Sequence, residues 1–235
     1  MAGQVLVIQH NSWERPGLIG VALAVAGLGY ESRMVFDDPA PELPQVKDLA
    51  GLVVMGGAMG ARDYDAYPGL AAEARLLRLA VDADLPVLGV CLGHQLIASA
   101  LGAQLHPGAT AEFGIGPVDV IAADPVTDPL GTSPQVLHWH RDAVDVPEGA
   151  TLLARTEQCP NQAFRAGSAV GLQFHLEVDS QLLSEWVTIR SMRADLPEDV
   201  ARRIAPDLRA AETTLVPTAM EAFGAFASTI KNHAD

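Results

Sequence analysis

Cysteine, basic residues and long apolar runs are all scarce in this 235-residue sequence. Its two cysteines, Cys91 and Cys159, are too few for a disulfide framework and are typical of a reducing compartment. Lys and Arg number 15 against 29 Asp and Glu, and the resulting net charge of −14 argues against binding to nucleic acid or to an anionic membrane surface. No apolar run reaches membrane-spanning length, and the first residues lack the basic segment of a secretory signal. These absences predict a soluble, cytoplasmic protein.

What the sequence does contain is a regular alternation of strand and helix patterns. A hydrophobic content of 49% with 19% charged residues is typical of a folded globular chain. Continuous or alternating apolar segments predict strands, and segments with helical length or period separate them. The predicted strands are 4–9, 30–36, 49–55 and 85–90, and the predicted helices are 17–29, 68–84 and 92–102. This order predicts an α/β fold with a doubly wound, mostly parallel sheet and helices on both faces.

The pattern changes after Phe113, where short β-rich pieces alternate with Pro, Gly and Asp turns. We expect these pieces, at 116–122, 135–140, 150–156, 163–167 and 169–175, to form a small mixed or antiparallel extension of the same sheet. Helices are predicted at 181–189 and at about 206–231, with Pro217 kinking or splitting the second. We expect one domain over 1–235, with a catalytic core at about 4–190. The helical segment from about 191 to 235 is either a partner or oligomer surface, or packs on the sheet.

Three residues with reactive side chains follow predicted strands, at the sheet edge where ligands bind in such folds. Cys91 lies in a G-x-C-x-G turn between Gly89 and Gly93, which predicts an exposed sulfur at a helix N-terminus that favours the thiolate. His175 and Glu177 are two apart on an extended segment, so their side chains point to one side. A buried cysteine is usually a small hydrophobe, and a lone histidine is usually structural. Their combination at strand ends favours a nucleophile, a base and a carboxylate that orients the base.

Several segments resemble the class I (triad-type) glutamine amidotransferase family. The cysteine turn "GVCLGHQ" and the downstream "GLQFHLEV" resemble its nucleophile and histidine motifs, and "VVMGGAMG" resembles its oxyanion-strand loop. "LHWHRDAV" and "CPNQAFRAG" resemble two further family segments. The resemblance covers about residues 4–190 in the family's order and implies its flavodoxin-like fold. The layout is similar to standalone proteins that resemble the glutaminase domain of GMP synthase.

The resemblance also implies a reaction. Cys91 would attack the side-chain amide carbon of L-glutamine and form a γ-glutamyl thioester, with His175 moving the protons and Glu177 supporting it. The further contacts implied are the backbone N–H groups of Gly57 and Leu92 for the oxyanion, and Gln95, Trp139 and His140 for the substrate. No cofactor is implied, and no group of His, Cys and carboxylates has the sequence spacing of a metal site.

The sequence leaves some alternatives open. Ala58, Leu176 and Trp139 depart from the family's commonest residues, although none of them is a reacting group. A γ-glutamyl hydrolase or peptidase would use the same triad, and a non-catalytic regulatory protein is a third reading. Ammonia from such sites normally passes to an acceptor, so a synthetase subunit in trans is implied, and a homo-oligomer is possible. The loop 10–17 borders the expected site, either as a specificity element or as a plain surface loop.

Overall fold

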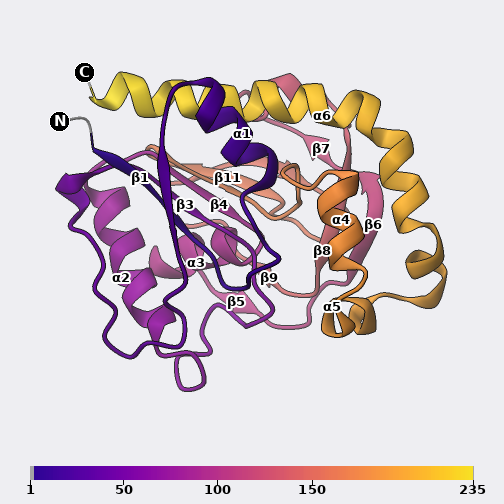
Figure 1. Ribbon diagram of the computed structural model, residues 1–235, viewed down its shortest axis with the longest axis horizontal. Coiled ribbons are helices and arrows are strands. Elements are labelled where there is room, and N and C mark those ends of the chain that lie inside the picture. Colours follow the sequence, from indigo (N-terminus) through magenta and orange to yellow (C-terminus); the bar gives the residue numbers. More distant parts are fainter. Residues whose placement is uncertain (1–2, 235) are drawn as a thin grey trace.

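An eight-stranded sheet forms the centre of the molecule, with its strands in the order β2-β1-β3-β4-β12-β11-β10-β7 (Figure 1). The computed structural model describes residues 3–234. Strands β2 to β12 in this order are parallel, and β11, β10 and β7 extend the sheet in antiparallel fashion. The bounds are β1 Gln4–Ile8, β2 Tyr30–Arg33, β3 Leu49–Val54, β4 Val87–Val90, β7 Asp119–Val120, β10 Thr151–Arg155, β11 Ala163–Ala166 and β12 Ala169–Leu172.

Helices cover both faces of the sheet, which confirms the predicted doubly wound α/β fold (Figure 1). Side chains alternate across a strand, so β1 sends Val5 and Val7 into one core and Leu6 and Ile8 into the other. The first core is closed by α1 (Gly17–Val25) and α6 (Glu198–Ala234). The second core is closed by α2 (Gly69–Asp82) and α3 (Leu92–Ala100). The carboxyl ends of the parallel strands therefore lie between two helical layers.

One predicted part of the sheet extension is wrong. The segment 135–140 forms β8 (Gln135–His140), which pairs with β6 (Glu112–Pro117) in a separate two-stranded sheet. Strands β5 (Leu105–His106) and β9 (Ala143–Val144) form another small sheet. An isolated bridge between Leu137 and His175 holds β8 over the end of β12. An alternating strand pattern does not specify its partner, and here the pairing brings β8 to the carboxyl edge of the main sheet.

The C-terminal segment packs on the sheet. Helix α6 buries a stripe of apolar side chains in the first core, formed by Leu208, Leu215, Phe223, Phe226 and Ile230. It begins at Glu198 rather than near residue 206, and Pro206 and Pro217 lie within it, so the helix is not split. Figure 1 shows it bent as it passes from one edge of the molecule to run across the sheet.

Shorter helices complete the chain. They are α4 Ser180–Trp186, α5 Arg190–Asp195 and the 3₁₀ turns Val46–Asp48 and Asp128–Leu130. The Asp179 side chain caps α4 by accepting a hydrogen bond from the Leu182 N–H at 2.8 Å. Within residues 3–234, no helix combines the length and the apolar character needed to cross a membrane.

Candidate active site

Cys91 occupies a strained turn between β4 and α3. Its backbone has φ = 53° and ψ = −104°, a region that residues other than glycine rarely adopt. Such a conformation costs of order 1–3 kcal/mol and is found mostly at functional sites. The turn places the Cys91 sulfur at the N-terminus of α3, where unpaired N–H groups and the helix dipole favour a negative charge.

The two flanking glycines are required by close backbone contacts. A methyl group on Gly93 would lie 2.0 Å from the Val54 carbonyl oxygen, and one on Gly89 would lie 2.5 Å from the Gly93 carbonyl oxygen. Both distances are far below van der Waals contact, so neither glycine of the G-x-C-x-G pattern has room for a side chain. The contact between Gly93 and Val54 holds the first turn of α3 against the end of β3.

His175 and Glu177 lie together beside this turn. His175 Nδ1 is 2.7 Å from Glu177 Oε1, and the two side chains are only 2% and 1% exposed. The ring of Trp186 packs edge-on against the imidazole at 5.2 Å, and the Trp186 indole N–H donates to the Trp13 carbonyl at 2.8 Å. The imidazole is therefore held on one side by a carboxylate and on another by an anchored aromatic ring.

Electrostatics favour the protonated form of His175. Burial by itself would lower the pKa of His175, because it disfavours the imidazolium. The Glu177 carboxylate and a hydrogen bond with the Cys91 side chain outweigh burial, and the pKa is raised well above 6.5. A cysteine beside an imidazolium is the arrangement that stabilises a thiolate. The structure thus brings the three residues of the predicted triad into one chain of contacts.

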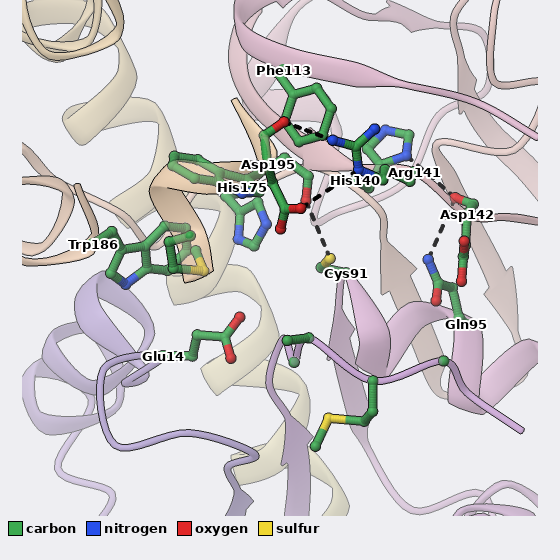
Figure 2. A pocket seen from close by; sticks show the side chains of 16 residues that line it. Glu14, Cys91, Gln95, Phe113, His140, Arg141, Asp142, His175, Trp186 and Asp195 are labelled. Atoms are coloured by element: carbon green, nitrogen blue, oxygen red, sulfur yellow. Dashed lines mark hydrogen bonds and ion pairs between the residues drawn. The ribbon is translucent and has the colours of Figure 1, made fainter. Parts of the chain in front are cut away.

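A cavity of about 200 Å³ opens above the Cys91 sulfur (Figure 2). Gly57, Cys91, Gln95, Trp139, His140 and His175 all line it, while Glu177 lies behind His175. Six of the eight residues predicted for the site therefore share one cavity. The volume is below the roughly 300–1,000 Å³ typical of pockets for drug-sized molecules. It suits a compound about the size of one amino acid.

Of the two predicted oxyanion residues, Gly57 lines this cavity and Leu92 follows Cys91 directly. Leu92 is the first residue of α3, so its N–H has no partner within the helix. Gly57 follows β3, and a methyl group on it would lie 2.5 Å from Leu92 Cδ2 and 2.7 Å from Met59 Sδ. This close packing leaves no room for a side chain and brings the Gly57 backbone next to Leu92.

The predicted substrate residues line the far side of the cavity. Gln95 Nε2 donates to Gln173 Oε1 at 3.0 Å, which orients its amide group. The Cys91 thiol donates to the Trp139 carbonyl at 3.7 Å, so the β8 backbone itself faces the nucleophile. The side chain of His140 points to Glu112, with Nε2 3.1 Å from Oε2.

The loop between β1 and α1 contributes to the same cavity, so residues 10–17 do not form a surface loop alone. Glu14 lines the cavity and is only 5% exposed (Figure 2). Burial raises the pKa of Glu14, and this outweighs the opposing hydrogen bond from Asn11 and the attraction of His175. His10, in the same loop, is hydrogen-bonded at 2.9 Å through Nδ1 to the Gly56 carbonyl and at 2.9 Å through Nε2 to Glu73 Oε2. The place of this loop at the carboxyl end of β1 was the only sequence signal for Glu14.

Other residues at the mouth of the cavity were not predicted. Arg141 stacks over Phe113, with its guanidinium carbon 4.8 Å from the ring centroid, and donates to the Asp195 carbonyl at 2.7 Å. These residues come from β6, the turn after β8, and α5, which are far apart in sequence. Phe113 and Arg141 lie side by side because β6 pairs with β8, a pairing that the sequence does not predict.

One group of potential metal ligands exists despite its wide sequence spacing. Ligand atoms of Glu112, His140 and Cys159 lie within 4.8 Å of one another. Each already has a protein partner, since Gln162 Nε2 donates to Glu112 Oε2 at 2.6 Å and the Cys159 thiol donates to the Asn161 carbonyl at 3.5 Å. These contacts form a hydrogen-bonded network around His140, at the end of β8.

Comparison with known proteins identifies relatives over most of the chain. The family model "Glutamine amidotransferase class-I" matches residues 21–188. The glutamine amidotransferase-like protein YfeJ of Salmonella typhimurium is 36% identical over 57% of this chain and 59% of its own length. One subunit of the glutamine-hydrolyzing GMP synthase of Methanocaldococcus jannaschii is 32% identical over 64% of this chain and 77% of its own length. For YfeJ the chain thus spans less than two thirds of the relative's length.

Solved structures agree with these matches. A glutamine amidotransferase from Thermotoga maritima superposes with a TM-score of 0.87 at 26% identity, covering 97% of this chain and 99% of that one. A glutamine amidotransferase from Methylobacillus flagellatus gives a TM-score of 0.86 at 28% identity, covering 97% and 95%. Together with the family model, these matches show that the chain belongs to the class I glutamine amidotransferase family.

Proposed function

We propose that this protein hydrolyses the side-chain amide of L-glutamine to glutamate and ammonia, with Cys91, His175 and Glu177 as its catalytic triad. The observation that carries the proposal is that Cys91 and His175 line one small cavity while Glu177 is bonded to His175 from behind. Cys91 stands at a helix N-terminus, beside an imidazole that is bonded to a buried carboxylate at 2.7 Å. Membership of the family supports the same assignment.

In the first half-reaction the Cys91 thiolate attacks the amide carbon, and the carbonyl electron pair moves to oxygen. The backbone N–H groups of Gly57 and Leu92 stabilise this oxyanion. When the carbonyl re-forms, the carbon–nitrogen bond breaks, and nitrogen takes the proton held by His175. Ammonia leaves and a γ-glutamyl thioester remains on Cys91.

In the second half-reaction water attacks the thioester while His175 takes its proton. The oxyanion forms again at the same backbone groups, and the carbon–sulfur bond then breaks to return the Cys91 thiolate. Glu177 keeps the imidazole in one orientation and stabilises its charged form in both halves. Gln95 and the backbone of Trp139 and His140 hold the amino-acid end of the substrate.

The size of the cavity favours glutamine over a γ-glutamyl peptide. A peptidase would need a wider opening near Trp139 and the loop 10–17. The cavity is about 200 Å³, and the Trp139 side chain packs edge-on against the rings of Phe113 and Trp186. We therefore treat free L-glutamine as the substrate.

The fate of ammonia is part of the proposal. Several relatives are named as one subunit of a GMP synthase, which supports an acceptor enzyme carried on a separate chain.

We infer that residues 4–190 and the C-terminal helix form one catalytic unit, because α6 completes the core over the sheet.

Glutamate release from L-glutamine tests the proposal. Wild-type protein is compared with a matched pair of variants, Cys91→Ser and Cys159→Ser, because Cys159 is a buried thiol outside the cavity. We expect release by wild type and Cys159→Ser and none by Cys91→Ser. Equal release by wild type and Cys91→Ser would contradict the proposal.

A further inference from the structure

Glu14 is a buried carboxyl in the cavity that the triad mechanism does not use. Its loop is fixed by Gln9, whose Nε2 donates to the Glu14 carbonyl at 3.3 Å. Asn11 Nδ2 donates to Glu14 Oε2, so one carboxyl oxygen is held by the protein. Within residues 3–234, no Lys or Arg forms an ion pair with Glu14. A carboxyl buried without a cationic partner is unfavourable for folding, and such groups occur mainly at functional sites.

The free oxygen of Glu14 faces the reacting groups. A methyl group on Gly56 would lie 3.1 Å from Glu14 Oε1, 3.6 Å from His175 Cε1 and 3.7 Å from Cys91 Cβ. Atoms of these three side chains therefore lie within 3.7 Å of the position that a Gly56 Cβ would occupy. That position is open because Gly56 has no side chain. Figure 2 shows Glu14, Cys91 and His175 on different sides of the cavity.

The geometry of an amide relates this position to the substrate. In a planar amide, oxygen and nitrogen lie on opposite sides of the reacting carbon. A carbonyl oxygen directed to the backbone N–H groups of Gly57 and Leu92 leaves the NH₂ group pointing away from them. An NH₂ group has two donors and needs acceptors in a buried site. Glu14 Oε1 lies near His175 Cε1, beside the position that a Gly56 Cβ would occupy, and within residues 3–234 no N–H group donates to it.

We propose that Glu14 accepts a hydrogen bond from the γ-amide NH₂ of the substrate and thereby selects a primary amide over other γ-glutamyl compounds. This inference rests on the proposed glutaminase function. In the tetrahedral intermediate the bond to Glu14 turns the nitrogen so that its lone pair faces His175. The carbon–nitrogen bond then breaks with its electron pair going to nitrogen, His175 supplies the proton, and neutral ammonia leaves, while Glu14 takes no part in the proton transfer.

The test compares two substrates that differ only in the leaving group. L-Glutamine offers N–H donors to Glu14, whereas the γ-methyl ester of L-glutamic acid offers none. The variants are Glu14→Gln, which removes the charge, and Glu14→Met, which removes the acceptor at similar length. Arg15→Gln is the matched control, because Arg15 lies on the same loop but forms an exposed ion pair with Glu185.

We expect Glu14→Met to lower kcat/KM for L-glutamine by about tenfold or more, the effect of losing one charge-assisted hydrogen bond. The kcat/KM for the ester should change by less than about threefold in Glu14→Met. For L-glutamine, the kcat/KM of Glu14→Gln should lie between those of wild type and Glu14→Met. Arg15→Gln should leave the ratio of the two substrates unchanged. Equal losses on both substrates, or an unchanged ratio in Glu14→Met, would overturn the inference.

Binding supplies a second readout that needs no turnover. In a Cys91→Ala background, calorimetry should show that Glu14→Met weakens L-glutamine binding by about tenfold and ester binding by less than threefold. Parallel weakening of both ligands would overturn the role of Glu14 while leaving the triad in place. If Cys91→Ala protein with Glu14 intact bound neither ligand, both this inference and the proposed function would fail.

Discussion

Replacing Glu177 by glutamine removes one negative charge from the triad and little else. The amide oxygen of the new side chain still accepts from His175 Nδ1, so the imidazole keeps its orientation and only the charge is lost. The native pair is separated by 2.7 Å and both side chains are at most 2% exposed, so solvent hardly screens it. A charge-assisted hydrogen bond contributes about 1.5–3 kcal/mol. The pKa of His175 should therefore fall, because the imidazolium loses the carboxylate charge that stabilises it.

The same charge stabilises the imidazolium that accompanies the Cys91 thiolate. At neutral pH we expect alkylation of Cys91 by iodoacetamide to slow by about tenfold or more in Glu177→Gln. Mass spectrometry of the two cysteine peptides measures the rate. Cys159 is an internal reference, because burial raises the pKa of its thiol to about 12. Glu185→Gln on α4 is the matched control, since Glu185 is 42% exposed and contacts Arg15.

Histidine NMR supplies the direct titration of His175. The reasoning is refuted if Glu177→Gln leaves both the His175 pKa and the Cys91 alkylation rate at their wild-type values. It is also refuted if Glu185→Gln slows alkylation as much as Glu177→Gln does, because the effect would then come from net charge rather than from the buried pair.

Four further substitutions should alter the free energy of unfolding, measured in urea, or its dependence on pH. Gly93→Ala should lower it by about 1–3 kcal/mol because the new methyl group meets the Val54 carbonyl, whereas Gly224→Ala, in an open position on α6, should raise it by about 0.5–1 kcal/mol. Phe226→Ala should cost about 3–5 kcal/mol, and a smaller loss would mean that α6 does not close the core. Burial lowers the pKa of His94 to about 3, so stability should fall as pH drops from 6.5 toward 4 by about 1.4 kcal/mol per unit from this residue. His94→Leu should make that acid dependence shallower, and an unchanged slope would contradict the assignment.

The alternating layers of this fold could be predicted from the sequence because they depend on local patterns. Strands β1, β3 and β4 are continuous apolar runs, and α2 and α3 each have one apolar side. These strands and helices could therefore be predicted without knowledge of long-range contacts. Cys91, His175 and Glu177 could be proposed from the sequence for the same reason, since each follows a strand whose end is visible there. The family resemblance then related these strand ends to one reaction.

The parts that could not be predicted depend on contacts between distant segments. Strand β8 has the pattern of any half-buried strand, and only its pairing with β6 excludes it from the main sheet. Helix α6 continues through Pro217, because a long apolar stripe buried on the sheet offsets the local cost of a missing N–H donor. Glu14 was recognised only as part of a loop, since burial of one carboxyl depends on the walls of the finished cavity.

The most direct test of the central claim is to trap the acyl-enzyme. Protein mixed with L-glutamine is quenched in acid within the first turnovers, digested, and analysed by mass spectrometry. The account predicts a γ-glutamyl group on the Cys91 peptide, none on the Cys159 peptide, and none when His175 is replaced by Ala. Glutamate formed at the wild-type rate with no adduct on Cys91, or an adduct on another residue, would contradict it.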